Sequence, residues 1–441
     1  MDWKRLFTSV EAVRLTAWRR EFHRHPELCW QEAWTTARIV EVLEEAGIPI
    51  LCGPQVIDRR AMRGYSPQQA REASARAAGW GASPAILARM EGVTGAVAVL
   101  DTGRPGPTVA LRFDVDALPL QELQSPSHRP FAQGFCSQNP GVMHACGHDG
   151  HIAGLLGAAE ILKQREEKLS VRVKLIFQPS EENTLGAAHI LAQGVLSDVD
   201  VIFGLHLFSD MKTGDVSIEA GPRMAQTDRF SITFEGKGGH AGKPHQCVDA
   251  TVMAADFVMS VQSIVSREVD PADSAVVTIG SLHSGSQYNV IAGTAQTEGT
   301  CRSFREETAL RLKEAVEARA EHIAAYYGGK ADITYHYGSH PPLVNDTSLT
   351  ACIAPEAERF LERKLCHVPP LMLGEDFSWY QTKVPGVFAF VGCGDPEKEC
   401  FPNHHPCFAI DERALADAVL LHLSAVSAAE KLAEKEAKTD V

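Results

Sequence analysis

Long apolar runs are missing from the sequence: no stretch of its 441 residues approaches the ~18 consecutive apolar residues that a membrane-spanning helix requires. The N-terminal stretch MDWKRLFTSVEAVRLTAWRR also lacks the apolar core of a signal peptide. An excess of positive charge is missing too, since the formal net charge is −14. We therefore expect no membrane partner, no nucleic-acid partner and a cytoplasmic location, although a local cationic pocket for an acidic small molecule is compatible with this charge.

Paired cysteines are absent as well. The eleven cysteines are an odd number, they are scattered along the chain, and none belongs to a CxxC motif. This pattern argues against a secreted protein held together by disulfides and favours reduced thiols in a cytosol.

The order of predicted elements indicates two domains. The chain is too long for one ordinary core. Apolar strands and helices alternate between residues 96 and 208, which predicts an α/β domain with a mostly parallel sheet covered by helices on both faces. Residues 225–338 follow the order strand, helix, strand, strand, helix, strand, which is that of a ferredoxin-like α+β unit. We expect residues 1–224 and 339–441 to form the first domain around this insertion.

The nine residues MHACGHDGH, 143–151, concentrate side chains that bind metals. Cys146 and His148 are one residue apart, so a loop leaving a strand end can direct both at one place. A thiolate and an imidazole suit Zn²⁺ or a neighbouring first-row ion. We expect the apolar helix IAGLLGAAEILKQREEKL to begin directly after this motif.

Further candidate ligands lie next to predicted strand ends, where open α/β sheets bind their ligands. Glu181 and Glu182 follow LIFQPS, His206 ends VIFGLH, and the loop PNHHPCF offers His404 or His405. Each residue alone is more often a surface or hydrogen-bonded group, and the glutamate pair alone is equally typical of an acidic helix N-terminus. The whole set at one edge of one sheet favours a metal site.

The motifs MHACGHDGH, FQPSEE, GLHLF, GGHAGKPH and HHPCF resemble the aminoacylase and carboxypeptidase-type family of two-metal hydrolases, over nearly the whole chain. They are most similar to the p-aminobenzoyl-glutamate hydrolase subunits and the indole-acetyl-amino-acid hydrolases. The resemblance implies a dinuclear-metal catalytic domain with an inserted ferredoxin-like lid, which mediates assembly into a homodimer or a heterodimer with a homologous chain. It also implies two divalent metal ions, Mn²⁺ or Zn²⁺; the cysteine favours Zn²⁺ because its sulfur is soft.

The resemblance further implies a role for each matching residue. It assigns the metal ligands to Cys146, His148, Glu182, His206 and His404. The cysteine would bridge the two ions, and Glu181 would be the general base. His405 would occupy a variable position, and His144, Asp149 and His151 would not be ligands. We expect Asp116 and Asp149 to orient imidazoles, and His151 to cap or pack the following helix.

In the inserted domain, the resemblance matches His240 to a histidine that reaches into the active site of the partner subunit and stabilises the oxyanion. Asn289 and Arg302 match positions that hold the carboxylate of the substrate, a task that suits the fork of an arginine. The sequence has Ala292 and Gly293 where the family pattern reads NVIPD, which affects the loop rather than the metal site.

The expected activity is that of a metal-dependent amidohydrolase. Its substrate would be an N-acyl or N-aroyl amino acid, such as p-aminobenzoyl-glutamate or indole-acetyl-aspartate, which it would cleave to an acid and an amino acid. Two alternatives are a hydrolase acting on another C–N bond, for example a deaminase of an aromatic amine, and a non-catalytic partner subunit. The second alternative would require the loss of a ligand or of the base, and the sequence retains all of them.

Overall fold

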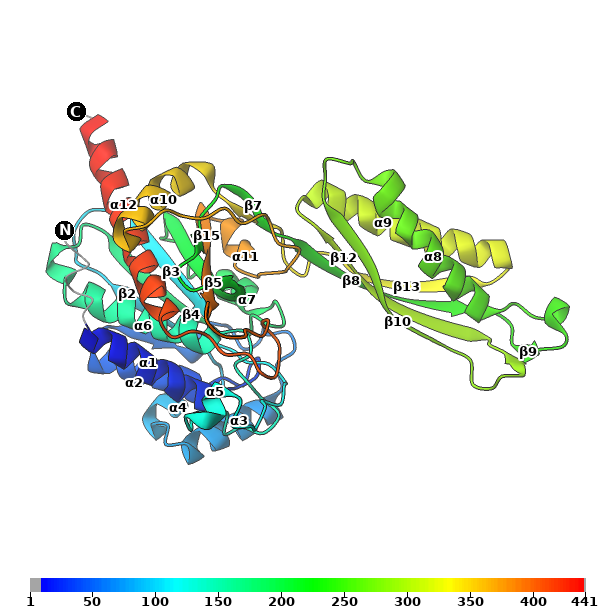
Figure 1. The fold of residues 1–441 in the computed structure, drawn as a ribbon, viewed down its shortest axis with the longest axis horizontal. Coiled ribbons are helices and arrows are strands. Elements are labelled where there is room, and N and C mark those ends of the chain that lie inside the picture. Colours follow the sequence, from blue (N-terminus) through cyan, green and yellow to red (C-terminus); the bar gives the residue numbers. More distant parts are fainter. Residues whose placement is uncertain (1–8, 440–441) are drawn as a thin grey trace. The chain divides into compact units, whose positions relative to one another are not determined.

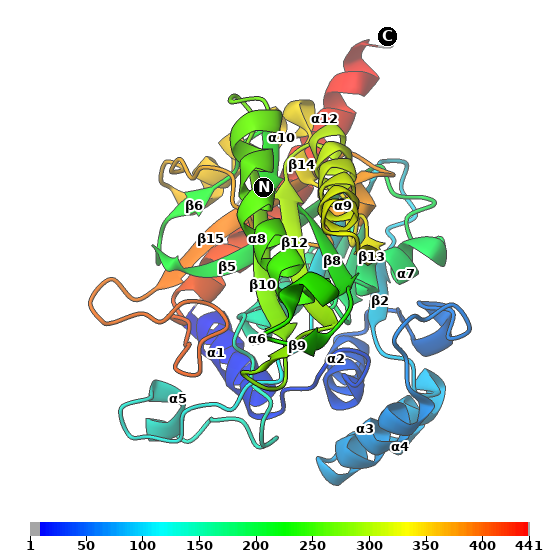
Figure 2. The ribbon, with the colours of Figure 1, turned by 90° about the vertical axis from the view of Figure 1, so that its right-hand side faces the viewer.

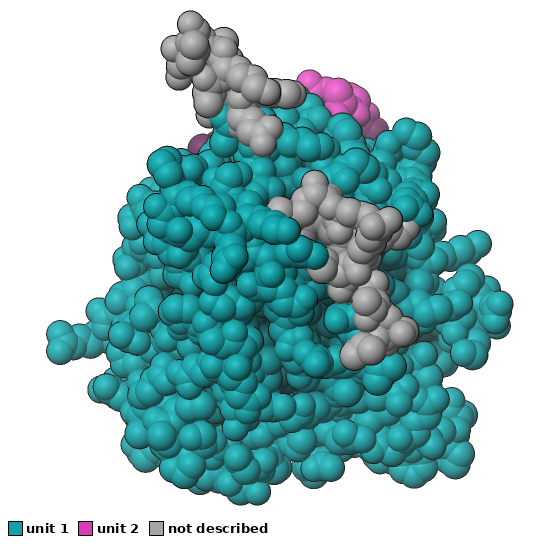
Figure 3. All heavy atoms as spheres, turned by 90° about the vertical axis from the view of Figure 1, so that its left-hand side faces the viewer, with its two compact units in different colours: residues 1–221, 344–368, 379–441 teal, residues 222–343, 369–378 magenta. Residues whose placement is uncertain are grey.

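The computed structural model describes residues 9–439, which form two compact units (Figure 3). Within these residues, unit 1 comprises the chain up to Gly221 together with Val344–Val368 and the part from Trp379 onwards. Unit 2 comprises Pro222–Leu343 and Pro369–Ser378. We describe each unit by itself.

Unit 1 is built on a seven-stranded sheet with the strand order β1-β2-β4-β3-β5-β15-β6 (Figure 1). Its strands are β1 (Ile50–Cys52), β2 (Ala96–Leu100), β3 (Thr108–Asp114), β4 (Arg172–Gln178), β5 (Val201–Lys212), β6 (Val216–Ser217) and β15 (Gly386–Gly394). The four central strands β4, β3, β5 and β15 run parallel, and the outer strands are antiparallel to their neighbours. All residues of β3 and β15 are buried, as in strands that are covered on both faces. The predicted mostly parallel sheet is confirmed.

Helices cover this sheet, and α6 packs against β3 and between α1 and α12. The helices of unit 1 are α1 (Ser9–Arg24), α2 (Ala33–Glu45), α3 (Pro67–Gly79), α4 (Pro84–Met90), α5 (Arg129–Ala132), α6 (His148–Lys163), α7 (Gly186–Ala192), α10 (Thr347–Leu361), α11 (Ser378–Gln381, which begins at the last residue of unit 2) and α12 (Ala414–Thr439). Short 3₁₀ turns span Gly53–Gln55 and Glu166–Lys168. Helix α6 begins inside the MHACGHDGH motif rather than after it, because Gly147 takes a left-handed conformation (φ +91°) and forms the N-cap. Among the described residues, no helix is both long enough and apolar enough to cross a membrane.

Unit 2 contains a four-stranded antiparallel sheet of order β10-β12-β8-β13, packed against two helices (Figure 2). These elements are β8 (Gln226–Glu235), α8 (Ala250–Glu268), β10 (Ala275–Ser284), β12 (Thr294–Ser303), α9 (Glu306–Tyr327) and β13 (Lys330–His336). Alternate residues of β8 are buried against the helices, where Phe230, Phe234 and Phe257 form much of the core. The chain order and strand order are those of a ferredoxin-like unit, so this part of the predicted fold is confirmed.

Short elements complete the chain. They are the two-stranded pairs β9 (Gly239–His240) with β11 (Val290–Ile291) and β7 (Gly221–Met224) with β14 (Leu343–Asn345), and the 3₁₀ turn Pro244–Gln246. All eleven cysteines lie among the described residues, and each is a free thiol.

Candidate metal centre

The five predicted ligands converge within unit 1. The Sγ atom of Cys146 lies 3.3 Å from Nε2 of His206 and 3.3 Å from Nε2 of His404. The Oε1 atom of Glu182 lies 3.6 Å from Nε2 of His404 and 3.9 Å from Nε2 of His148. Ligand atoms within 4.8 Å of one another form two sets, Cys146 with His148 and His206, and Cys146 with Glu182 and His404. Because the two sets share Cys146, its sulfur would be the ligand common to two ions.

Three parts of the unit 1 sheet and its loops position these groups. Cys146 ends a loop, and His148 is the first residue of α6. His206 lies inside β5, not at its end as predicted, because β5 continues to Lys212 along its distant partner β15. Its pairing with β3 stops earlier, at Gly204, so the sheet opens on that side two residues before His206.

The acidic pair sits on a strained turn between β4 and α7. Ser180 and Thr184 have φ values of +63° and +60°, a region that residues other than glycine rarely adopt. Helix α7 begins only at Gly186, so the pair does not lie in the first turn of a helix. The turn instead directs Glu181 and Glu182 to His148, with ligand atoms of all three within 4.8 Å of one another.

In the C-terminal loop, the His404 side chain points to the cluster, whereas the His405 side chain does not. His404 has a φ of +68°, and its N–H donates to the carbonyl of Ala145 at 2.7 Å. His405 stacks on the Phe401 ring, with centroids 4.7 Å apart, and its Nδ1 accepts a hydrogen bond from a backbone N–H. Asn403, which the sequence analysis missed, donates from Nδ2 to the carbonyls of Cys146 and Leu207, each at 3.1 Å. Asn403 therefore connects this loop to the segments that contain Cys146 and His206.

Hydrogen bonds orient two of the imidazoles. His148 donates from Nδ1 to the carbonyl of Asp116 at 2.8 Å, and His206 donates from Nδ1 to the carbonyl of Leu207 at 2.9 Å. Each ring therefore directs its Nε2 atom to the cluster. Nε2 of His148 and Oε1 of Glu182 are buried and have no hydrogen-bond partner. Buried polar atoms are normally satisfied, so these orphaned donor atoms fit a site that binds divalent cations.

The protonation equilibria of the cluster also fit a cation site. Burial raises the pKa of the Cys146 thiol well above its usual range and that of Glu182 to about 7. Burial lowers the pKa values of His206 and His404, so both rings are neutral, which is the form that ligates. Burial also acts against a charged His148, but the Asp114 carboxylate and Cys146 raise its pKa above its usual range. A divalent ion favours the thiolate and carboxylate forms and displaces these protons.

Asp116 and Asp149 lie near the cluster, and the sequence predicted the contacts of only one of them. As expected, Asp116 contacts a ligand imidazole, and its Oδ2 accepts the N–H of Glu182 at 2.9 Å. Asp149 differs from the expectation, because its Oδ2 forms an ion pair with Arg19 and a hydrogen bond with His23, each at 2.8 Å, and neither residue belongs to the candidate metal centre.

His151 does more than pack the start of α6. Its Nε2 accepts the N–H of Leu207 at 3.0 Å, and its Nδ1 donates to Oδ1 of Asp114 at 2.5 Å. Asp114 was not assigned a role from the sequence; its signal is a carboxylate at the end of the buried strand TVALRFD. Together these residues hold the backbone next to His206.

The remaining predicted site residues lie in unit 2. His240 pairs with Val290 in the β9–β11 ribbon, so it lies next to Asn289, whose carbonyl accepts the N–H of Ala241 at 3.1 Å. Both His240 and Asn289 are exposed. Arg302 lies on β12 instead and donates to the carbonyl of Met372 at 2.7 Å.

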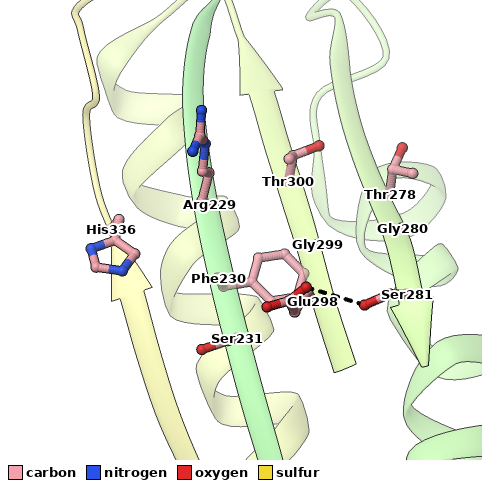
Figure 4. A pocket seen from close by; sticks show the side chains of 10 residues that line it. All are labelled: Arg229, Phe230, Ser231, Thr278, Gly280, Ser281, Glu298, Gly299, Thr300 and His336. Carbon is pink, nitrogen blue, oxygen red and sulfur yellow. Dashed lines mark hydrogen bonds between the residues drawn. The ribbon is translucent and has the colours of Figure 1, made fainter. Parts of the chain in front are cut away.

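A cavity of about 590 Å³ lies over the four-stranded sheet of unit 2 (Figure 4). Its lining includes Arg229, Glu298 and His336, and Glu298 accepts a hydrogen bond from Ser281. Burial lowers the pKa of Arg302, and the charge of Arg229 lowers it further. The charges of the two guanidinium groups therefore interact.

Comparisons with known proteins agree with this geometry. Residues 110–428 match the model of Peptidase family M20/M25/M40. The chain is 38% identical to an N-acetylcysteine deacetylase of Bacillus subtilis over 91% of this chain and 93% of the relative. It is 35% identical to an IAA-amino acid hydrolase of Arabidopsis thaliana over 92% of this chain and 83% of that protein.

Two solved structures extend the comparison to the fold. A dinuclear metal binding peptidase of the M20 family from Bacillus subtilis has a TM-score of 0.75 and 33% identity, covering 97% of this chain and 99% of that one. The aminobenzoyl-glutamate utilization protein of Klebsiella pneumoniae has a TM-score of 0.71 and 25% identity, covering 97% and 98%. The resemblance predicted from the motifs is thereby confirmed. The chain belongs to Peptidase family M20/M25/M40 and is a metal-dependent amidohydrolase of that family.

Proposed function

We propose that this protein hydrolyses the amide bond of N-acyl or N-aroyl amino acids and releases a carboxylic acid and an amino acid. The observation that carries the proposal is the donor set of Cys146, His148, Glu182, His206 and His404, whose ligand atoms converge, with a further carboxylate, Glu181, beside it. The names of the relatives support the substrate class, because they include N-acetylcysteine deacetylase, IAA-amino acid hydrolase and aminobenzoyl-glutamate utilization protein. Within this class, p-aminobenzoyl-glutamate and indole-acetyl-aspartate are the substrate types that we propose.

The donor set would hold two divalent ions, Mn²⁺ or Zn²⁺, with Cys146 shared between them. Bound ions at such a site polarise the amide carbonyl and make water a stronger nucleophile at neutral pH. The thiolate and imidazole donors favour Zn²⁺, and the carboxylate of Glu182 is compatible with Mn²⁺.

Glu181 is the group that moves the proton. Its side chain lies next to the donor set and is only 8% exposed, so few waters compete with its carboxylate. The carboxylate takes a proton from the attacking water and delivers it to the nitrogen of the leaving amino acid. Glu182 cannot share this role while its carboxylate ligates an ion.

The unit 2 residues bind the other end of the substrate. We assign the α-carboxylate of the amino acid to Arg302 and Asn289. The contact of Arg302 with Met372 uses only one of the five guanidinium N–H donors. Arg229 provides a second cation for an acidic side chain, such as that of glutamate or aspartate. His240 donates to the oxyanion in the active site of the partner subunit, so the assembly that we propose is a homodimer, or a heterodimer with a homologous chain, formed through unit 2.

A substrate panel on metal-defined protein tests the proposal. Protein stripped with a chelator should be inactive and should regain activity with Zn²⁺ or Mn²⁺. Released amino acid is then measured by mass spectrometry for N-acetyl, indole-acetyl and p-aminobenzoyl conjugates of glutamate, aspartate, cysteine and alanine. Acidic and aromatic conjugates should be cleaved fastest. Full activity in a metal-free preparation, or no hydrolysis of any conjugate by metal-loaded protein, would contradict it.

A further inference from the structure

A long excursion of the chain precedes the candidate metal centre. Leu118 and Met143 close its base through two backbone hydrogen bonds of 3.1 and 3.0 Å. Between them, the only regular element is the four-residue helix α5. Loops of this length need their own stabilising contacts, because regular backbone hydrogen bonding does not supply them. Side chains therefore contribute to holding this segment in place, together with backbone hydrogen bonds from Leu123 to Pro406 and from Gln138 to Arg24.

The buried carboxylate of Glu122 lies at the centre of the loop. Its Oε1 is 2.9 Å from Nε2 of His128 and 2.9 Å from Nε2 of His23, and its Oε2 accepts the N–H of Ser137 at 2.6 Å. Glu122 and His128 are 1% and 4% exposed. Cys136 completes the group, since the ligand atoms of Glu122, His128 and Cys136 lie within 4.8 Å of one another.

The chemistry of these three side chains is that of a zinc site. A carboxylate, an imidazole and a thiol are the donor types that Zn²⁺ takes in proteins, and structural sites draw their ligands from short, closely spaced segments. Here all three lie between residues 122 and 136 of one loop. An ion that joins them closes two short loops at once, which reduces the conformational freedom of the unfolded chain.

We propose that Glu122, His128 and Cys136 bind a third divalent ion, Zn²⁺, at a structural site that shares no residue with the candidate metal centre. His23, whose Nδ1 is held by Asp149 at 2.8 Å and whose Nε2 faces Glu122, or a water molecule, completes a four-coordinate site. Binding releases the thiol proton of Cys136 to solvent.

The competing explanation is a hydrogen-bond hub without any ion, because Glu122 already accepts bonds from its neighbours. Anomalous diffraction from a crystal of the zinc-loaded wild-type protein separates the two. Data at the zinc edge should show a peak between Glu122, His128 and Cys136, in addition to those at the candidate metal centre. Peaks at the metal centre with no peak at Glu122 would overturn the proposal. This measurement does not depend on activity, so it stands apart from the test of the substrate class.

Variants give a second measurement in solution. Cys136→Ser retains a hydrogen-bond donor but removes the thiolate, so the zinc content of dialysed protein should fall by one ion per chain. The rise in melting temperature that zinc produces should also become smaller. The control is Cys352→Ser, a half-buried thiol on α10, which should keep the wild-type zinc content. Wild-type zinc content in folded Cys136→Ser protein would overturn the proposal, and if this variant fails to fold, the crystal measurement decides.

Discussion

We assign proton transfer to the side chain of Glu181 and metal binding to the adjacent Glu182. Glu181→Gln should lower kcat by about 10²–10⁴-fold, because an amide cannot accept the proton of water. The variant should keep its metal content, since Glu182 still points into the donor set. Steady-state kinetics and elemental analysis of the same preparation check both parts.

Glu182→Gln is the matched control for that prediction. It changes the adjacent residue in the same way, but it should lose metal as well as activity. Turnover by Glu181→Gln within a few-fold of the wild-type rate would show that another group is the base.

A second prediction at this scale concerns a buried histidine that no mechanism uses. The His422 ring packs edge-on against Phe113 and Phe203, and neither of its nitrogens has a partner. Burial, with the nearby His151, lowers the pKa of His422 to about 3. The unfolded chain binds this proton near pH 6.5 and the folded chain does not, so stability falls as the pH drops from 6.5 towards 3.

His422→Leu should remove this contribution, which amounts to about 1.4 kcal/mol for each pH unit below 6.5. Denaturant titrations at pH 7, 6 and 5 should therefore show a shallower loss of stability than in the wild type. The exposed His322→Leu should keep the wild-type slope. Parallel slopes for His422→Leu and the wild type would mean that His422 is protonated in the folded state.

Sequence motifs predicted which residues gather at the metal centre, but not how they are held there. The types and order of Cys146, His148, Glu182 and His404 can be read from the chain. The roles of Asp114 and Asn403 could not be, because each acts by a hydrogen bond to a group far away in the sequence. Such contacts depend on which way a side chain faces once the sheet is assembled.

Among the elements, the turn between β4 and α7 has no space for a larger side chain at Gly186. A Cβ on Gly186 would lie 1.8 Å from the carbonyl oxygen of Pro179, a backbone atom that cannot rotate away. Gly186→Ala should therefore displace the turn that carries Glu181 and Glu182. We expect a loss of about 1–3 kcal/mol in stability, together with a lower metal content.

Gly79→Ala is the control for this prediction, because no atom lies within 4 Å of the added Cβ. Denaturation and elemental analysis of the two variants should differ clearly. If Gly186→Ala kept wild-type stability and metal content, the turn would be more adaptable than its close backbone contact indicates.

The order of helices and strands could be predicted from hydrophobic periodicity. The residues at which they begin and end often could not. The α/β alternation and the ferredoxin-like order are local patterns, and the structure has both. The extent of β5 beyond His206 depends on pairing with β15, which is far away in the sequence. The start of α6 depends on the conformation of one glycine, and hydrophobic spacing carries no information about it.

For the whole molecule, the proposed dimer leads to a test by complementation. His240→Ala and Glu181→Gln should each be nearly inactive alone. If His240 acts in the partner subunit, a mixed dimer contains one site with both groups intact and one with neither. Random exchange of equal amounts should then restore about a quarter of the wild-type activity, because half of the dimers are mixed and each has one working site.

Native mass spectrometry shows whether subunits exchange, and the activity assay is run on the same samples. Each variant incubated alone under the same conditions is the control. Complete exchange without recovery of activity would mean that His240 acts within its own chain or has no catalytic role.

Cys146 and His404 are 258 residues apart in the sequence. This separation affects the order in which parts of the chain can fold during synthesis. Four of the donors leave the ribosome early, but the sheet of unit 1 still lacks β15 and the last histidine at that stage. All of unit 2 is translated in between, and it has a core of its own. The nascent chain therefore can fold its inserted unit while the surrounding one waits for its C-terminal part. An ion captured by the early donors stays open to exchange until translation is nearly complete.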